Sequence, residues 1–353
     1  MTDDIDLPEP LAGTPADSGK RVTIYDVAKV AGVAPSTVSR AYSRPGRVNA
    51  ETGQRIREIA LKLGYHARPV ARVDAGEATK LLAFVVADVS NPVYSQIMQG
   101  FQIEATTAGY TVMLLDSHED DLVERRSIES VIDLVDGIVL TSSRMSDSAI
   151  NQIAKVRPVV AINRVVRTVP SIIPDSTQGM DDVLSLLHEA GHEHVTYLAG
   201  PQASWADGMR WRGLVEAAGK LSLKKLRRIG PNPPSPEGGA AAFASWREHP
   251  SSAVVAYNDL LAIGFTRAAQ ASGLVVPDDV SVIGVDNSLV TQIVTPRLTS
   301  LAASTQLMGM RAAQVLIRQL QHRSERHAHT LVVPMTLHER ESVTTSPTSL
   351  KGR

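Results

Sequence analysis

The stretch VTIYDVAKVAGVAPSTVSRAYSRPGRVNAETGQRIREIALKLGY at residues 22–65 contains three helical patterns in close succession. Thr23 and Asp26 have the spacing of a capping box, and small apolar residues recur on one face behind them. We therefore expect a first helix over residues 24–31. Gly32 should end it, because glycine readily takes the left-handed conformation that follows a helix.

A second and a third helix are expected after this glycine. Pro35 suits the first turn of the second helix, whose Val38 and Ala41 can pack against the first helix. The third helix should begin near Ala50, because apolar residues recur there at helical spacing up to the next glycine. The order helix, glycine turn, helix is typical of the helix-turn-helix motif, in which the second helix enters the major groove of DNA.

The outward face of the second helix carries groups that suit nucleic acid. Residues 21–72 contain ten basic and three acidic residues, a formal charge of +7 in a chain whose net charge is −1. Arg40 can donate two parallel hydrogen bonds to a guanine edge. The side chains expected at the phosphates are Thr23, Tyr25, Thr37, Ser39 and Asn49. The alternative is a solvated helical cap whose charges only keep the protein in solution.

The composition is that of a folded globular protein. Of the 353 residues, 43% are hydrophobic and 21% are charged, and there is no cysteine, which excludes disulfides and zinc–thiolate sites. Residues 1–20 are acidic, lack a secretory signal and are expected to be disordered. The apolar runs, such as LLAFVVA at 81–87, are too short to cross a bilayer. We therefore expect a cytoplasmic protein with no membrane partner.

From about Lys80 onward, short apolar runs alternate with amphipathic stretches of helical length. This alternation is typical of βαβ units with parallel sheets. The length of the region predicts two Rossmann-like parallel-sheet lobes. The expected fold class is therefore α/β, with an N-terminal all-α helix-turn-helix head.

Residues 22–65 closely resemble the DNA-binding head of the LacI/GalR family of bacterial repressors. The resemblance covers roughly residues 22–345 and continues in SNPVYSQIMQG (90–100), PVVAINR (158–164), GHEHVTYLAGP (191–201), AYNDLLAIG (256–264), VSVIGVDNSLVTQIVTPRLTSL (280–301) and HERESV (338–343). It implies a homodimer on a near-palindromic operator, with Pro35, Ser36 and Arg40 at the base-reading positions. It also implies a periplasmic-binding-protein-like sensor that closes around an effector, and no cofactor, catalytic residue or metal.

The resemblance also implies a domain layout. It comprises a disordered leader (1–20), the head (21–65), a hinge (66–79), the effector-binding and dimerisation domain (80–345) and a flexible tail (346–353). Within the sensor, lobe 1 is expected at about 80–178 and 307–337, and lobe 2 at about 179–306 and 338–345.

The hinge departs from the family pattern at one position. Arg68 and Arg72 suit phosphate or minor-groove contacts. Asp74, however, stands where the family usually places a leucine that wedges into the minor groove, and a carboxylate does not enter between base pairs. Either Val73 takes that place or the DNA kink is shallower.

Polar side chains follow several of the apolar runs, where ligands bind to open parallel sheets. These residues are Asn91, Tyr94, Asn163, Asn258 and Asp286, and Arg210 lies on a helical stretch nearby. The resemblance implies effector contacts at five of these six residues, all but Asn91. The family usually stacks an aromatic side chain on the effector where this chain has Pro234, so Trp205 is expected to supply the stacking face. Such donors and acceptors suit a sugar or sugar phosphate. The alternative is that single Asn and Asp residues only cap strands or helices.

Two other functions compete with a regulator. A solute-binding protein for transport would need an export signal and no basic head. A zinc hydrolase would use the HExxH motif His188–His192, but Gly191 should end the helix and take His192 off the face that a metal requires. We therefore predict a sequence-specific DNA-binding regulator, a repressor as is common in the family, that responds to a small molecule and is not an enzyme.

Overall fold

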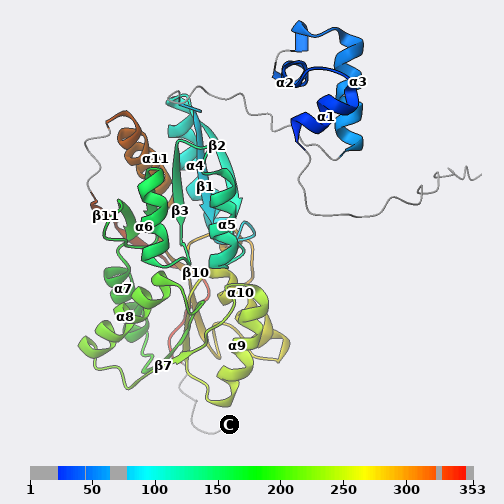
Figure 1. The fold of residues 1–353 in the computed structure, drawn as a ribbon. Coiled ribbons are helices and arrows are strands. Elements are labelled where there is room, and N and C mark those ends of the chain that lie inside the picture. The colour runs from blue at the N-terminus through cyan, green and yellow to red at the C-terminus, as the bar shows by residue number, and fades with distance from the viewer. Residues whose placement is uncertain (1–22, 44, 64–77, 323–327, 347–353) are drawn as a thin grey trace, which may run out of the picture. The chain divides into compact units, whose positions relative to one another are not determined.

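The computed structural model describes residues 23–43, 45–63, 78–322 and 328–346 (Figure 1). The chain divides between Ala78 and Thr79 into two compact units. The expected leader at 1–20 and the hinge residues Arg68, Arg72 and Asp74 lie outside the described residues.

The helices of the first unit, the head, follow the predicted order. They are α1 (Ile24–Ala31), α2 (Pro35–Ser43), the short 3-10 helix η1 (Pro45–Arg47) and α3 (Ala50–Lys62). Gly32 ends α1 with a φ of 66°, the left-handed conformation that glycine adopts without strain. Val27, Val38 and Ile56, one from each α-helix, are fully buried in one small core. The expected helix-turn-helix fold is confirmed.

Lobe 1 of the second unit is a parallel sheet of six strands in the order β11-β5-β4-β3-β1-β2 (Figure 1). The strands are β1 (Leu81–Val86), β2 (Thr111–Asp116), β3 (Gly137–Thr141), β4 (Val159–Ile162), β5 (Ser171–Pro174) and β11 (Thr330–Val333). The helices are α4 (Pro92–Thr107), α5 (Asp121–Val131), α6 (Asp147–Val156) and α11 (Thr305–Gln321). Along β1, Phe84 packs with α4 and α11, and its neighbour Val85 packs with α5 and α6. The sheet therefore has a core on each face, as the unbroken apolar runs predict.

Helices α4 and α11 approach each other at two glycines. A Cβ atom at Gly309 would lie 1.9 Å from the carbonyl oxygen of Ile97, and one at Gly100 would lie 2.0 Å from the carbonyl oxygen of Gln306. Both neighbours are backbone atoms, which cannot turn away as a side chain can. Each helix thus uses a glycine to let the other's backbone come close.

Lobe 2 is a second sheet of six strands in the order β12-β10-β9-β8-β6-β7. The strands are β6 (His194–Leu198), β7 (Lys225–Ile229), β8 (Ala253–Ala256), β9 (Ser281–Val285), β10 (Thr299–Ala303) and β12 (Met335–His338). All pairs are parallel except β10 with β12, which is antiparallel. Two packed helix pairs flank the sheet (Figure 1), namely α7 (Ser176–Glu189) with α8 (Trp205–Lys220) and α9 (Pro236–Glu248) with α10 (Asp259–Ala271). The short 3-10 helix η2 (Leu289–Gln292) lies between β9 and β10.

The chain passes between the lobes three times. The crossings lie between β5 and α7, between β10 and α11, and between β11 and β12. The third crossing comes earlier than the boundary expected at residues 337–338, because Met335 to His338 already pair with β10 of lobe 2. The first crossing is joined to the third by a hydrogen bond of 2.9 Å from the Asp175 N–H to the Val333 carbonyl.

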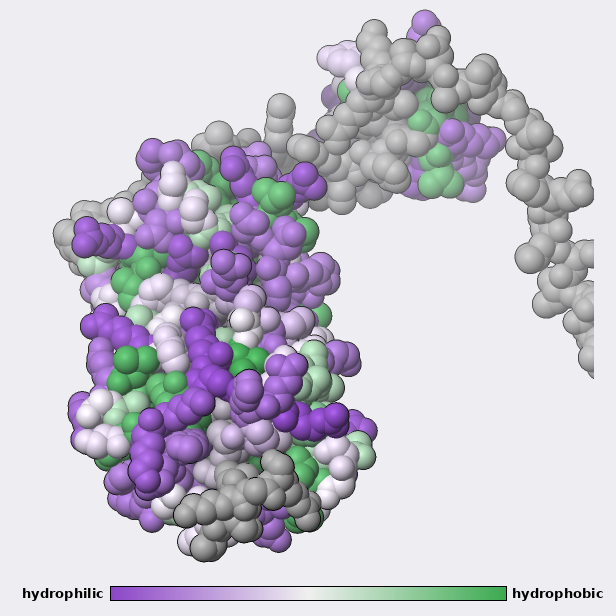
Figure 2. All heavy atoms as spheres, turned by 90° about the horizontal axis from the view of Figure 1, so that it is seen from below, coloured by the Kyte–Doolittle hydropathy of each residue, from purple (hydrophilic) through white to green (hydrophobic). Residues whose placement is uncertain are grey.

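None of the helices in the described ranges is long and apolar enough to cross a membrane. On the face of the molecule in Figure 2, hydrophilic and hydrophobic residues are interspersed. Such a mixture is ordinary for a folded protein, because polar groups never cover the whole surface.

Candidate functional site

Helix α2 of the head separates its buried residues from its polar ones. Val38 and Ala41 lie in the core, whereas Ser36, Ser39 and Arg40 are exposed. Pro35 and Thr37 are partly exposed. The predicted base-reading and phosphate-binding residues of this helix are therefore accessible to a large partner.

The other predicted phosphate contacts of the head have local structural roles. The Thr23 hydroxyl and backbone N–H both donate to the carboxylate of Asp26, at 2.6 and 2.7 Å, so this pair forms the predicted cap of α1. The Asn49 side-chain oxygen accepts from the Glu51 N–H at 2.9 Å and caps α3. Tyr25 is exposed. Phosphate binding by these residues stays a prediction.

In the second unit, strained backbone gathers where strands end. Of the eight described non-glycine residues with a positive φ, six lie within three residues after a strand end, and they are His118, Glu119, Ser142, Asn163, Asp286 and Asn287. Residues other than glycine adopt this conformation at a cost, and such strain is concentrated at functional sites. The carboxyl ends of the strands of both lobes are therefore the candidate ligand site, as predicted for parallel sheets.

Three polar residues of lobe 1 form one connected wall of this site. Tyr94 lies in the first turn of α4 and is almost fully buried, and its hydroxyl hydrogen-bonds to Ser142. The Asn163 amide donates to the same Ser142 oxygen at 3.2 Å. Burial raises the pKa of Tyr94, so the phenol stays neutral and can act as donor or acceptor. Ser142, which was not predicted from the sequence, thus joins two of the predicted effector residues.

The opposite wall, in lobe 2, is built around Arg210. This buried guanidinium lies 3.5 Å from the Asp286 carboxylate and 4.7 Å from the centre of the Tyr257 ring, and it donates to the Tyr257 carbonyl. Its Nε has no hydrogen-bond partner among the described residues. Burial raises the pKa of Asp286, the buried Asp259 raises it further, and Arg210 opposes the shift. A ligand hydroxyl could reach both a carboxylate acceptor and a guanidinium donor here.

Asn91 connects the two walls. Its side-chain oxygen accepts from the Val93 N–H at 3.1 Å and begins α4, while its side chain also hydrogen-bonds to Asp286 across the cleft. Asn163, Arg210 and Asp286 line a cavity of about 20 Å³ beside the crossover strands. This volume holds about one water molecule. A ligand as large as a sugar therefore requires the lobes to move apart.

Two predicted effector residues are placed differently. Asn258 is buried and caps α10, because its oxygen accepts from the Leu261 N–H at 2.9 Å and its amide donates to the Pro234 carbonyl at 3.1 Å. This matches the capping alternative that the sequence left open. Trp205 begins α8 and is partly exposed. The aromatic ring against Arg210 is instead that of Tyr257.

A charged pair on the lobe 1 wall was not predicted from the sequence. Arg144 follows β3, is buried, and binds the Glu119 carboxylate with an N–O distance of 2.6 Å. Burial raises the pKa of Glu119, although Arg144 opposes this shift. The rule that found Asn91 and Asn163, a polar residue after an apolar run, would have found Arg144 had it been applied to the run at 137–140.

The HExxH motif is structural. Helix α7 ends at Glu189, and Gly191 has a φ of 83°. His192 is fully buried, and its ring nitrogens lie 2.8 Å from the Ser252 hydroxyl and 3.0 Å from the Thr344 carbonyl. The carbonyl requires the proton on Nε2. Burial lowers the pKa of the ring and favours its neutral form, in which Nδ1 accepts from Ser252. Both ring nitrogens thus have partners, Nδ1 in the Ser252 hydroxyl and Nε2 in the Thr344 carbonyl.

Acid should destabilise lobe 2 through His192. Burial lowers the pKa of this ring below its ordinary value, so the unfolded chain binds a proton more readily than the folded one. The contribution of neutral His192 to the free energy of unfolding is complete above about pH 6.5. It is lost as the pH falls from there through the pKa of the folded state, by at most about 1.4 kcal/mol per pH unit. Urea unfolding followed by tryptophan fluorescence measures this loss, because Trp205, Trp211 and Trp246 all lie in lobe 2.

The matched variants for this measurement are His192→Gln and His188→Gln. His188 is exposed on α7, so its replacement should leave the acid dependence unchanged. His192→Gln should make the free energy of unfolding depend less on pH in this acid range. Equal acid dependence in wild type and His192→Gln would contradict the assignment.

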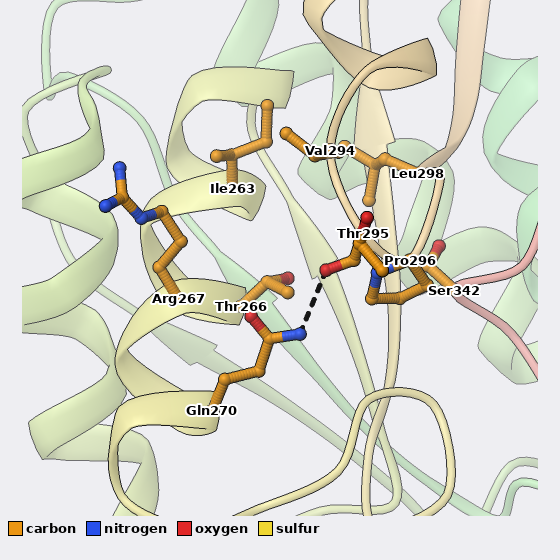
Figure 3. Close-up of a pocket in the computed structure, with 9 residues that line it drawn as sticks. All are labelled: Ile263, Thr266, Arg267, Gln270, Val294, Thr295, Pro296, Leu298 and Ser342. Atoms are coloured by element: carbon orange, nitrogen blue, oxygen red, sulfur yellow. Dashed lines mark hydrogen bonds between the residues drawn. The ribbon is translucent and has the colours of Figure 1, made fainter.

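A separate hollow lies on the outside of lobe 2 (Figure 3). It has a volume of about 310 Å³ and lies between α10 and residues 294–298. The Gln270 amide donates to the Thr295 carbonyl across it at 3.0 Å. Four of its seven other lining residues are apolar, namely Ile263, Val294, Pro296 and Leu298. It contains none of the residues of the cleft between the lobes.

Two family models match this chain. The model described as "Bacterial regulatory proteins, lacI family" matches residues 23–68, and the "Periplasmic binding protein-like domain" matches residues 184–343. The HTH-type transcriptional repressor CytR of Escherichia coli K12 is 29% identical over 85% of this chain and 90% of its own length. The HTH-type transcriptional regulator DegA of Bacillus subtilis is 28% identical over 93% and 99%.

Solved structures share the architecture. A transcriptional regulator CelR–cellobiose complex is 26% identical, with a TM-score of 0.68 over 91% of this chain and 100% of that one. The lac repressor dimer bound to operator and the anti-inducer ONPF is 23% identical, with a TM-score of 0.69 over 92% and 100%. The second likeness concerns the fold alone.

Proposed function

Because the chain belongs to the LacI family of bacterial regulatory proteins, we propose that it is a transcriptional repressor whose affinity for operator DNA changes when a small ligand binds between the lobes. It acts in the cytoplasm, where the operator is. The sequence-reading element is α2, with Arg40 as the principal contact to bases.

The polarity of α2 carries the DNA-binding part of this proposal. Its apolar residues are used in the head's core, and its hydroxyls and one guanidinium are left on the surface. Pro35 and Ser36 are too short to reach far into the groove, so discrimination rests on Arg40 and on DNA shape. Arg68 and Arg72 are proposed to add phosphate contacts.

The ligand is proposed to be a sugar or a sugar phosphate. The cleft offers a neutral phenol, an amide, a guanidinium and a carboxylate, from Tyr94, Asn163, Arg210 and Asp286. Such a set binds polyhydroxylated molecules through alternating donors and acceptors. The cellobiose in the complex of the 26% identical regulator supports the same class.

Ligand binding is proposed to change operator affinity by moving the lobes. The two walls belong to different lobes, and in the part of the chain that the structure describes the lobes are joined by the three crossover segments and by side chains across the cleft. A ligand that prefers one lobe separation shifts the population toward it. Such coupling usually changes affinity at the second site by about 1–3 kcal/mol.

The working form is proposed to be a homodimer, because a near-palindromic operator needs two heads. Val294 lines the hollow of Figure 3. Its neighbour in the chain, Ile293, is 73% exposed, and Leu289 on η2 is 66% exposed. Exposed apolar residues beside an apolar hollow are typical of an interface. We propose that a second copy of the chain covers them.

Ile293→Asp should weaken this dimer at least about ten-fold, since a charge would be placed at the centre of an apolar contact. Sedimentation velocity over a concentration series measures the change. The matched control is Val156→Asp on α6 of lobe 1, where the side chain is 56% exposed. If both variants dimerise like the wild type, this surface is not the interface.

Selection of genomic DNA fragments by the purified full chain tests the proposed function. It is carried out at one stated salt concentration, because phosphate contacts make affinity depend strongly on salt. We expect a near-palindromic sequence to be enriched, and we expect one member of a panel of sugars and sugar phosphates to change its occupancy. No enrichment over random fragments would refute the regulator.

A further inference from the structure

The surface of the head carries positive charge with no anionic partner among the described residues. Every salt bridge between described residues lies in the second unit. The guanidinium of Arg55 donates to the Ala31 carbonyl, which is a neutral group. The exposed basic residues of the described head are Lys29, Arg40, Arg47, Arg55, Arg57 and Lys62.

The acidic residues of the described head serve its own helices. Asp26 accepts from the hydroxyl and the backbone N–H of Thr23 at the start of α1. Glu58 accepts from the Gln54 amide at 3.2 Å on α3. Glu51 lies in the first turn of α3, where a carboxylate suits the helix dipole. The exposed cations of the head are therefore available to an anion from outside its three helices.

The same chain carries an anionic segment directly before the head. This leader (1–20) lies outside the described residues. Its first 19 residues contain no Lys or Arg and five acidic residues, namely Asp3, Asp4, Asp6, Glu9 and Asp17. A carboxylate accepts charge-assisted hydrogen bonds from Arg and Lys just as a phosphate does. The leader therefore has the chemistry to bind the groups that are predicted to bind DNA.

The leader joins the head at the surface that is predicted to face DNA. It ends three positions before Thr23, which is exposed and is predicted, with Tyr25, to contact phosphates. Twenty residues can span at most about 70 Å. The longest described helix of the head, α3, has 13 residues and a length of about 20 Å. The leader carboxylates can thus reach every exposed cation of the head, at an effective concentration on the order of millimolar.

We propose that the acidic leader binds the DNA-reading face of its own head, around α2 and Arg40, and competes with DNA phosphates for this face. This inference rests on the proposed function. The leader and DNA cannot bind the same cations at once, so the leader has to leave before either an operator or a random sequence binds. It therefore lowers the affinity for all DNA by one common factor. In this way the leader sets how strong the base contacts must be for a site to be occupied.

Deletion of residues 2–18 from the full-length protein tests this competition. The probe is a fluorescent duplex of random sequence, about twenty base pairs long, whose anisotropy reports binding. We expect the deletion to raise the affinity about ten-fold at about 0.1 M salt, because several weak exposed ion pairs act together. At about 1 M salt the gain should vanish, since charges are then screened beyond about 3 Å.

Two variants of equal net charge separate the leader from charge in general. The first keeps the length of the leader and should reproduce the gain in affinity, and its changes are Asp3→Asn, Asp4→Asn, Asp6→Asn, Glu9→Gln and Asp17→Asn. The matched control removes the same number of charges from exposed positions of the second unit, by Asp121→Asn, Asp133→Asn, Glu248→Gln, Asp278→Asn and Glu339→Gln. It should bind the duplex like the wild type.

Chemical cross-linking locates the leader on the protein. Arg40→Lys places an amine on the exposed face of α2, and a water-soluble carbodiimide joins an amine to a carboxylate that touches it. We expect leader peptides joined to position 40, and an excess of the random duplex should suppress them. Lys155, exposed on α6 of the second unit, is the internal control and should not be joined to the leader.

The possible results distinguish this inference from the function on which it rests. If the deletion variant binds the duplex no more tightly than the wild type at low salt, the competition is overturned and the DNA-binding proposal stands. The same holds if the matched control gains as much affinity as the neutralised leader, or if leader peptides are joined only to lysines of the second unit. If neither the wild type nor any variant binds duplex DNA at low salt, the proposed function fails and this inference fails with it.

Discussion

Arg40→Ala should reduce the affinity of each head for its operator half-site by about 10- to 100-fold, because a bidentate arginine–guanine pair contributes about 1–3 kcal/mol of discrimination. A dimer loses this contact twice. Binding to random DNA should fall much less, since it depends on the many phosphate contacts of the head. Fluorescence anisotropy with the selected operator and with a scrambled fragment, at the same salt, measures both losses.

Two further variants separate base reading from simple charge. Arg40→Lys keeps the charge but presents a single ammonium in place of the planar fork, so it should lose most of the operator preference. Lys62→Ala removes an exposed charge near the end of α3 and should affect operator and scrambled DNA alike. If Arg40→Lys preserves the preference in full, Arg40 acts only as a charge and another residue reads the bases.

Gly309→Ala should destabilise the second unit by about 3 kcal/mol or more, although alanine is the better helix former. The added methyl would lie 1.9 Å from the carbonyl oxygen of Ile97, so α4 and α11 would have to move apart. Overpacking of a core usually costs about 1–3 kcal/mol, and here the obstacle is backbone. Urea unfolding followed by circular dichroism measures the loss.

The matched control is another glycine to alanine change within a helix. At Gly219 on α8 nothing lies within 4 Å of the added Cβ. There, alanine should raise the free energy of unfolding by up to about 1 kcal/mol, through helix propensity. The two substitutions should thus have opposite signs. Equal effects would mean that the close approach of α4 and α11 is not a tight constraint.

The sequence was most informative where local rules decide the structure. The capping pair Thr23 and Asp26 and the turn at Gly32 bound α1 as predicted. The unbroken apolar runs predicted strands such as β1, β3, β8 and β9, which are buried along their length, whereas β7 (KLRRI) has no such run. The end of α7 before Gly191 likewise removed His192 from a possible zinc site.

Contacts between distant segments were beyond such rules. The hydrogen bond between the His192 ring and the Thr344 carbonyl joins residues 152 positions apart, and no spacing in the sequence connects them. Asn258 satisfies the rule for a ligand contact and also caps α10, because a polar residue after a strand often stands at the N-cap of the next helix. The third crossing came earlier than expected because β12 pairs antiparallel with β10, which a parallel βαβ pattern does not predict.

The three crossings have a consequence for how the protein is made. Lobe 1 begins at the start of the second unit, but its α11 and β11 are translated only after most of lobe 2. In the folded protein, α11 covers one face of the lobe 1 sheet through Met308, Ala312 and Leu316. Until α11 leaves the ribosome, that face lacks this helix. The nascent chain therefore carries an uncovered apolar face through most of its synthesis, when it is most open to chaperones and to aggregation. The cleft, which needs both lobes, is among the last parts of the molecule to form.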